Sequence, residues 1–361
     1  HGARVLEAFR RWGYLAADLD PLGRLPPAGP PELTIGGEAA EAARRIYCGT
    51  LAVEFMHLPE PERRTWIAER MEAPAPPVDH EGRRRILDQL MRSEVFEETI
   101  QTRYIGSKRF SIEGVAALIP LLVTAIEECA EDGADQAMIA MSHRGRLNVM
   151  SQVIGRTPVE LFAGFEDVDP RSVLGSGDVK YHLGATGTLV TPTGKTVRLH
   201  LNSNPSHLEV VSSVAMGRMR AKLTRLGDVT GRKIVPLLLH GDSAFAGQGI
   251  AAETLNFAAL DGFEVGGALQ IVVNNLIGFT TEPKAYSSTR YATDIARRLP
   301  VPIFHVNAED PEAVVRAATI AVDYRFAFGS DVVIDPIGYR RYGHSEVDDP
   351  TVTQPLLYRR I

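Results

Sequence analysis

The stretch that decides the fold is Ile234-Val235-Pro236-Leu237-Leu238-Leu239-His240-Gly241-Asp242-Ser243, followed after one segment by Ala268-Leu269-Gln270-Ile271-Val272-Val273-Asn274-Asn275. Short runs rich in Ile, Val and Leu, such as 234–239 and 268–273, are typical of buried parallel strands. Residues 248–260, between the two runs, have the length and the apolar spacing of one helix. The stretch therefore predicts a strand–helix–strand unit with parallel strands.

A polar residue follows each predicted strand, Asp242 after the first and Asn275 after the second. In open α/β sheets, ligands bind in the crevice beyond the carboxyl ends of the strands, and we expect both side chains there. A carboxylate and an amide oxygen suit a hard cation, and Mg²⁺ usually binds few protein groups together with phosphate oxygens. Either residue alone would more simply cap a loop, but the pair favours a metal site. Small residues after Asp242, beginning with Ser243 and Ala244, allow backbone amides to approach a diphosphate.

Strands and helices alternate from residue 136 onward. This alternation predicts an α/β fold, with a parallel sheet and helices on both faces. Residues 171–207 are irregular and contain several glycines, which predicts loops and a small hairpin. The other predicted strands lie at 136–141, 303–306 and 331–334, and the other predicted helices lie at 83–103, 114–129, 158–165, 210–225 and 311–328.

Three segments of different character follow one another along the chain. Residues 1–72 predict a helical N-terminal segment, with helix-type spacing at 4–12 and 39–55. Residues 73–82 are rich in proline and predict a stiff linker. Residues 83–361 are predicted to form the α/β domain that binds a diphosphate and Mg²⁺.

Composition limits the class of protein. The chain has 361 residues, 44% of them hydrophobic, which is enough for two domains with sizeable cores. Its net charge is −6. The absence of a long block of one charge argues against nucleic acid as the main partner. No apolar run approaches the roughly 18 residues of a membrane span, and no secretory signal is visible. Cys48 and Cys129 lack metal-like spacing and predict reduced thiols in a cytosolic-type compartment.

Gly-Asp followed at this distance by Asn-Asn resembles the metal and diphosphate motif of thiamine-diphosphate enzymes. Further segments narrow the resemblance to the decarboxylating first component of the 2-oxoglutarate dehydrogenase complex. They stand in the family's order and run through nearly the whole chain. These segments are LDPLG at 19–23, KRFSIEG at 108–114, SHRGRLN at 142–148, GDVKYH at 177–182, NPSHLE at 204–209, VNNLIGFTT at 273–281 and YRRYGH at 339–344.

The resemblance implies a role for each matching residue. Mg²⁺ would be bound by the side chains of Asp242 and Asn275 and by the backbone oxygen of Ile277. His143 and His182 would hold the 2-oxo acid and act as the catalytic residues. The other residues implied to contact thiamine diphosphate are Arg144, Ser243 and Ala244 at its diphosphate, Leu208 along the cofactor, and Ser206 beside both cofactor and substrate.

The implied histidines make chemical sense, because imidazoles can donate to the oxygens of a 2-oxo dicarboxylate and can shuttle protons near neutral pH. For His143 alone, capping the turn after a strand would be the simpler role. The chain departs from the family at Ser243, where Ala is usual, and at Ser345, where Asn is usual. We expect a hydroxyl to be tolerated at Ser243, and we assign no catalytic role to the segment around Ser345. Lys108 and Arg109 would either attract the anion or form a solvated basic face.

The implied activity is oxidative decarboxylation of 2-oxoglutarate in the tricarboxylic acid cycle, with succinyl transfer to the lipoamide of a partner acyltransferase. In this family the active sites lie at a dimer interface, and a second domain binds the aminopyrimidine and supplies a glutamate. We find no such domain in the sequence. We therefore expect this chain to be the truncated, diphosphate-binding half of the catalytic region. Alone, it should bind the cofactor weakly, if at all, and should not decarboxylate 2-oxoglutarate. The implied location is the cytoplasm of a bacterium or the mitochondrial matrix of a eukaryote.

Three other functions compete with this one. A 2-oxoadipate dehydrogenase of the same family stays open, although Lys180-Tyr181-His182 looks more like the 2-oxoglutarate version. A non-catalytic scaffold or regulatory subunit also stays open, but the presence of Asp242 and Asn275 speaks against a role without a ligand. A nucleotide-binding dehydrogenase is disfavoured, because Gly175-x-Gly177 lacks a third glycine and a strong preceding strand.

Overall fold

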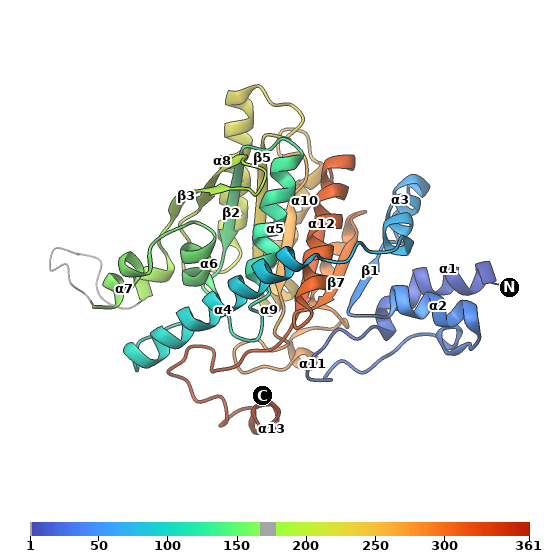
Figure 1. Ribbon diagram of the computed structural model, residues 1–361, viewed down its shortest axis with the longest axis horizontal. Coiled ribbons are helices and arrows are strands. Elements are labelled where there is room, and N and C mark those ends of the chain that lie inside the picture. Colours follow the sequence, from blue (N-terminus) through green and yellow to red (C-terminus); the bar gives the residue numbers. More distant parts are fainter. Residues whose placement is uncertain (1, 167–177) are drawn as a thin grey trace.

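One twisted sheet organises the molecule (Figure 1). The computed structural model describes residues 2–166 and 178–361, and Gly175 and Gly177 lie outside them. Within these ranges the strands form an eight-stranded sheet in the order β1-β7-β8-β6-β5-β2-β4-β3. The strands are β1 (Leu51–Glu54), β2 (Gln136–Met141), β3 (Ala185–Val190), β4 (Thr196–Leu201), β5 (Ile234–Gly241), β6 (Leu269–Val273), β7 (Ile303–Asn307) and β8 (Val332–Ile337).

The sheet is parallel except at its two edges. β1 pairs antiparallel with β7 at one edge, and β3 pairs antiparallel with β4 at the other. β5 and β6 are parallel neighbours, with Gly241 opposite Val273, which confirms the predicted strand–helix–strand unit. The helix predicted at 248–260 is present as a helix at Gly249–Asn256 followed by a 3-10 turn at Phe257–Ala259, and a further short helix, at Asp242–Gly247, precedes it. The carboxyl ends of β5 and β6 therefore lie side by side at one edge of the sheet.

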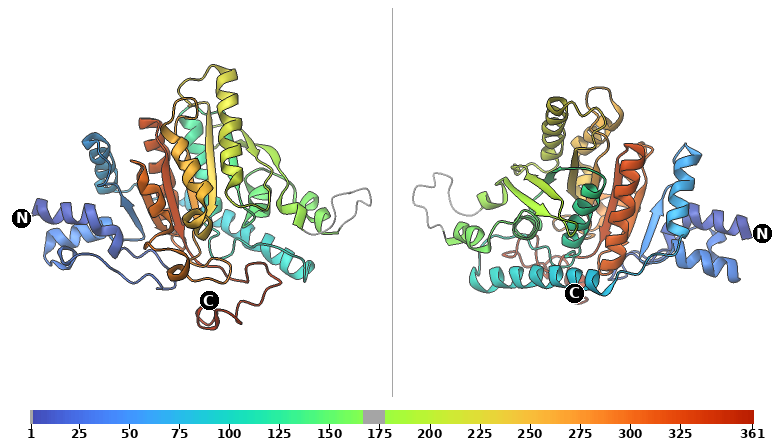
Figure 2. Two further views of the ribbon diagram at one scale, coloured as in Figure 1. Left: turned by 180° about the vertical axis from the view of Figure 1, so that it is seen from behind. Right: turned by 45° about the horizontal axis from the view of Figure 1, so that its top comes forward.

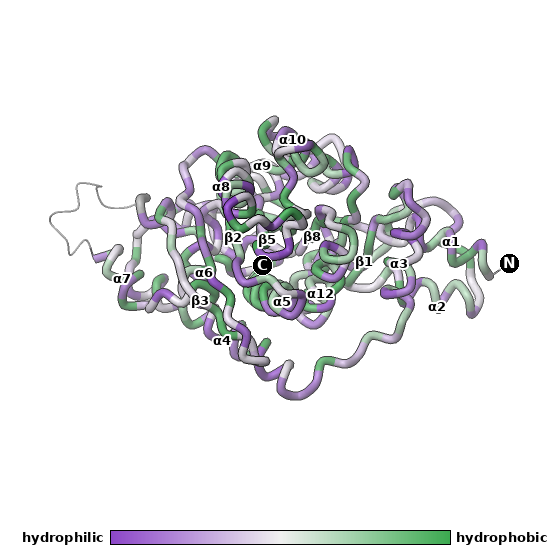
Figure 3. The backbone as a smooth tube through the Cα atoms, turned by 90° about the horizontal axis from the view of Figure 1, so that it is seen from above, coloured by the Kyte–Doolittle hydropathy of each residue, from purple (hydrophilic) through white to green (hydrophobic). Residues whose placement is uncertain are grey.

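Helices cover both faces of the sheet, as predicted. Figure 3 shows α5 and α12 on one side of the strands and α8, α9 and α10 on the other, and Figure 2 gives two further views. The helices are α1 (Gly2–Trp12), α2 (Glu38–Tyr47), α3 (Pro61–Glu72), α4 (His80–Arg103), α5 (Leu118–Glu131), α6 (Arg146–Gln152), α7 (Pro158–Glu166), α8 (Val210–Leu226), α9 (Asp242–Gly247), α10 (Gly249–Asn256), α11 (Pro283–Tyr286), α12 (Pro311–Phe328) and α13 (Pro355–Tyr358).

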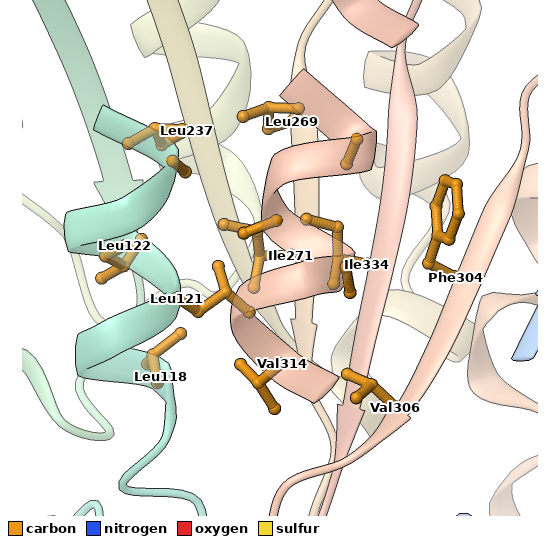
Figure 4. Packing of buried hydrophobic residues seen from close by; sticks show 14 of the residues in the cluster. Leu118, Leu121, Leu122, Leu237, Leu269, Ile271, Phe304, Val306, Val314 and Ile334 are labelled. Atoms are coloured by element: carbon orange, nitrogen blue, oxygen red, sulfur yellow. The ribbon is translucent and has the colours of Figure 1, made fainter. Parts of the chain in front are cut away.

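The largest apolar cluster lies between the sheet and the helices α5 and α12. Leu121 and Leu122 of α5 pack toward Ile271 of β6 and Ile334 of β8, and all four side chains are fully buried (Figure 4). Full burial of such a side chain contributes about 1.5–3 kcal/mol each. This core fixes the relative positions of the central strands and therefore of the residues that follow them.

The N-terminal segment differs from its prediction. The helix predicted at 39–55 ends at Tyr47, and Leu51–Glu54 forms β1, which adds an edge strand to the sheet. Four buried residues in a row give no helical or alternating pattern, so this strand depends on its pairing with β7 rather than on a local signal. Residues 2–72 are therefore helical in large part but also contribute to the sheet.

The remaining predicted elements are present. α4 begins at His80, where the Asp79 side chain accepts a hydrogen bond from the Gly82 N–H at 2.7 Å, so the proline-rich stretch ends at a capped helix. The hairpin expected within 171–207 is formed by β3 and β4. Every helix in the described ranges is too short or too polar to cross a lipid bilayer.

Candidate active site

The carboxyl ends of β5 and β6 open into a small cavity of about 70 Å³. Asp242 is the first residue of α9, directly after β5, and Asn275 lies in the loop that follows β6. The cavity brings together eight residues that the sequence analysis selected. These are His143, Arg144, Leu208, Asp242, Ser243, Ala244, Asn275 and Ile277.

Asp242 is a buried acid that accepts hydrogen bonds from neutral groups. Its side chain is 3% exposed, and Oδ2 accepts a hydrogen bond from the hydroxyl of Tyr286 at 2.6 Å. Burial raises the pKa of Asp242 to about 6, although the bonds from Tyr286 and from the Ser243 N–H act in the opposite direction. A buried carboxylate attracts a cation more strongly than a solvated carboxylate does, because little water screens the two charges.

Asn275 offers an unused oxygen beside that acid. The residue is 5% exposed, and its Oδ1 is buried without a hydrogen-bond partner among the described residues. Leu276, the next residue, has a φ of 54°, which is a strained backbone conformation for a leucine. Clusters of three or more His, Cys, Asp or Glu that could hold a metal are absent from the described ranges. The oxygens that could hold a hard cation here are one carboxylate, one carboxamide and the backbone carbonyl of Ile277.

The loop after Asn275 passes very close to α9. A Cβ atom on Gly278 would lie 2.6 Å from the Cβ of Ser243, so only glycine fits without a shift. We expect Gly278→Ala to push the loop away from Asp242 and to lower the free energy of unfolding by about 1–3 kcal/mol, measured by urea denaturation. Gly217→Ala in α8 is the control, because its Cβ would meet nothing within 4 Å. The control should stabilise by about 0.5–1 kcal/mol, and equal effects of the two substitutions would contradict this tight contact.

Two arginines give the cavity a positive wall. Arg144 donates to the carbonyl oxygens of Ser111 at 2.9 Å and His344 at 2.8 Å, and Arg340 donates to the carbonyl of Phe279 at 2.8 Å. Burial, and next the charge of Arg340, lowers the pKa of Arg144 to about 10, so the guanidinium of Arg144 remains charged at neutral pH. Because carbonyl partners do not cancel a charge, the wall attracts an anion. Arg340 lies in the motif YRRYGH at 339–344, but the resemblance alone implied no role for it.

Two histidines line the same cavity and contact each other. The rings of His143 and His344 lie 5.5 Å apart, and Phe110 packs on His143 at 4.0 Å between ring centres. Burial, and next the charge of Arg144, lowers the pKa of His143 to about 3 and that of His344 to about 4. Both imidazoles are therefore neutral at neutral pH and can donate one N–H each. No role was predicted for His344, because its neighbour Ser345 departs from the family pattern.

Two selected residues lie away from the cavity walls. His182 is near enough to His143 to lower its pKa slightly, but it does not line the cavity. Ser206 is exposed and does not line the cavity, although Leu208, two residues later, does. The structure thus brings together the predicted metal and diphosphate residues but not the whole predicted substrate set.

The fold is that of the thiamine-diphosphate-dependent α/β enzymes. Residues 88–361 match the family described as "Dehydrogenase E1 component", and the chain belongs to this family.

Curated relatives are similar over 99% of the chain. It is 44% identical to a "Multifunctional 2-oxoglutarate metabolism enzyme" of Mycolicibacterium vanbaalenii and covers 32% of that protein. It is 42% identical to a "2-oxoglutarate dehydrogenase E1/E2 component" of Corynebacterium glutamicum, with 32% covered, and 43% identical to a "2-oxoglutarate dehydrogenase E1 component" of Brucella anthropi, with 40% covered. The chain thus spans 32–40% of the length of these relatives.

Proposed function

We propose that this chain carries the metal- and diphosphate-binding part of a thiamine-diphosphate-dependent 2-oxoglutarate dehydrogenase. The observation that carries the proposal is the meeting of Asp242 with the unpartnered Oδ1 of Asn275 in one cavity at the ends of adjacent parallel strands. The names of the relatives support 2-oxoglutarate as the substrate. The reaction proposed is oxidative decarboxylation, followed by succinyl transfer to the lipoyl group of an acyltransferase partner.

The metal proposal rests on the chemistry of the donors. Mg²⁺ prefers oxygen ligands and commonly combines one or two protein groups with phosphate oxygens and water. Asp242 would supply the charge, Asn275 a neutral oxygen and Ile277 its backbone carbonyl. This set fits a metal that arrives with a diphosphate, because one carboxylate alone would hold Mg²⁺ weakly.

The diphosphate would lie between the metal and the arginine wall. Arg144 and Arg340 supply fixed positive charge, and Ser243 and Ala244 present small side chains at the cavity. The hydroxyl of Ser243 can donate to a phosphate oxygen. Leu208 adds an apolar surface for the rest of the cofactor.

The substrate would be bound by neutral imidazoles beside that charge. His143 and His344 can each donate an N–H to a carboxylate or carbonyl oxygen of the 2-oxo acid, while the arginines supply the attraction. The proposal also assigns His182 and Ser206 to the substrate, and it requires the loops that carry them to move inward. Thiamine diphosphate, when bound, supplies the electron sink for loss of CO₂.

The setting of the reaction is part of the same proposal. We propose a homodimer as the working unit, with the pyrimidine-binding part of the active site supplied by residues outside this chain. We propose a cytoplasmic location, because the relatives named above are bacterial and both Cys48 and Cys129 are free thiols.

The test has a binding step and a turnover step. Isothermal titration with thiamine diphosphate should show heat that requires Mg²⁺, and a chain that serves only as a scaffold should show none. With the complete enzyme, CO₂ release should be faster from 2-oxoglutarate than from 2-oxoadipate. The reverse preference would favour the 2-oxoadipate enzyme, and absence of metal-dependent heat in the complete enzyme would reject the site.

A further inference from the structure

A chain of buried hydrogen bonds runs from the edge of the sheet to the proposed metal loop. His305 on β7 contacts Glu54 of β1 through Nε2 at 2.7 Å and Asp335 of β8 through Nδ1 at 2.8 Å. The other oxygen of Asp335 accepts from the side-chain N–H of Asn274 at 3.0 Å. All four side chains are at most 2% exposed. Although burial opposes the charge, the bonds to Asp335 and Glu54 raise the pKa of His305 to about 9, so both ring nitrogens donate at neutral pH.

Asn274 connects this chain to the residues that follow it. Its Oδ1 accepts a hydrogen bond from the backbone N–H of Leu276 at 3.1 Å, while its Nδ2 is bound to Asp335. Its backbone is also fixed, because its N–H donates to Pro336 at 3.1 Å and its carbonyl accepts from Gly338 at 2.8 Å. The side chain of Asn274 therefore holds the turn in which Leu276 takes its strained φ of 54°.

A second contact reaches the same loop from the N-terminal segment. Arg24 donates to the carbonyl of Asn275 at 3.2 Å and to that of Leu276 at 3.2 Å, and it also reaches Gly338 at 3.1 Å. Arg24 is itself held by Asp20, which lies 3.7 Å from its Nε and accepts from its backbone N–H. The peptide groups on both sides of Leu276 are thus fixed by residues far away in the sequence.

We propose that the N-terminal segment positions the magnesium-binding oxygens of Asn275 and Ile277 through these two arms. Glu54, acting through His305, Asp335 and Asn274, forms one arm, and Arg24 forms the other. These are positioning residues, because none of them supplies a proposed metal ligand. The inference rests on the proposed function of the site and adds that its geometry depends on β1 and on the loop at 20–24.

The physical reason lies in the demands of the ion. Mg²⁺ requires nearly ideal octahedral geometry at short distances, whereas Ca²⁺ accepts variable geometry and longer distances. A loop that has lost one of its supports can still present its oxygens, but it presents them less accurately. Loss of a positioning residue should therefore weaken Mg²⁺ binding more than Ca²⁺ binding.

The experiment uses one substitution in each arm, Glu54→Met and Arg24→Met, in the complete enzyme. Mg²⁺ and Ca²⁺ affinities are measured by titration at a fixed, saturating concentration of thiamine diphosphate. Each variant should bind Mg²⁺ about 10-fold or more weakly, as is typical when outer partners of a metal site are removed. The ratio of Mg²⁺ to Ca²⁺ affinity should fall in both, and Arg24→Lys should restore part of it.

A stability-matched control separates positioning from a general loss of structure. Val322→Ala removes buried apolar contacts of a residue in α12 that belongs to neither arm, and it should leave the ratio of metal affinities unchanged. Folded variants of both arms with the wild-type ratio would overturn the inference. Absence of Mg²⁺-dependent binding in the wild type would instead reject the proposed function, so the two failures are distinguishable.

Discussion

Replacing Asp242 with alanine is expected to reduce Mg²⁺-dependent binding of thiamine diphosphate by at least about 100-fold. Asp242 is the single carboxylate among the proposed ligands, and it is 3% exposed, so its attraction for a cation is little screened by water. Neither the amide of Asn275 nor the carbonyl of Ile277 carries a charge that could replace it. Isothermal titration of the complete enzyme with cofactor, with and without Mg²⁺, measures the effect.

Removing the buried charge of Asp242 should not unfold the protein, so a loss of cofactor binding can be attributed to the site itself. A buried carboxylate without a cationic partner costs free energy in the folded state. Asp242→Asn removes the charge but keeps an oxygen for the hydroxyl of Tyr286, so its melting temperature without metal should equal or exceed that of the wild type. Asp261→Ala, at an exposed position, should change neither binding nor stability. Wild-type binding by Asp242→Ala would reject the assigned metal site.

The central part of the site could be predicted because strand geometry fixes it. Parallel strands of buried Ile, Val and Leu end at the same edge of the sheet, so Asp242 and Asn275 could be placed together from their positions alone. Arg340 and His344 could not, because they lie in the irregular segment after β8, where no periodic pattern shows which side chains turn inward. The strand β1 was missed for a related reason, since its four residues show no alternating pattern and the strand depends on its pairing with the distant β7.

Arg109 shows a different limit of sequence reasoning. The sequence left it as either an attractor of the substrate or part of a solvated basic face, and the structure shows neither. Its side chain is 2% exposed, and it contacts Glu97 at 2.9 Å, Glu346 at 3.6 Å and Glu113 at 3.7 Å. Glu346 is more than two hundred residues away along the chain, so no local pattern could reveal this cluster. The cluster holds the loop that carries Phe110 against His143.

We expect Arg109→Met to lower the free energy of unfolding by about 3–5 kcal/mol at pH 8, because it leaves three buried carboxyls without their shared cation. Burial raises the pKa of Glu97 and Glu113, and it raises that of Glu346 to about 7, while the charge of Arg109 acts in the opposite direction. The substitution should therefore raise these pKa values further. Urea denaturation of the wild type and the variant at pH 8 and pH 5 measures the difference.

The sign of the pH dependence follows from those shifts. A carboxyl whose pKa is higher in the folded state than its ordinary value of 4.5 binds more protons when folded, so its contribution to stability is complete below pH 4.5 and is lost as the pH rises through about 7. The difference between wild type and Arg109→Met should thus be largest at pH 8 and smaller by more than about 1 kcal/mol at pH 5. Arg83→Met provides the control, because its ion pair with Glu312 is exposed and should contribute under about 1 kcal/mol at either pH. A loss of stability in Arg109→Met that is the same at both pH values would show that packing of the long side chain, rather than its charge, holds the loop beside His143.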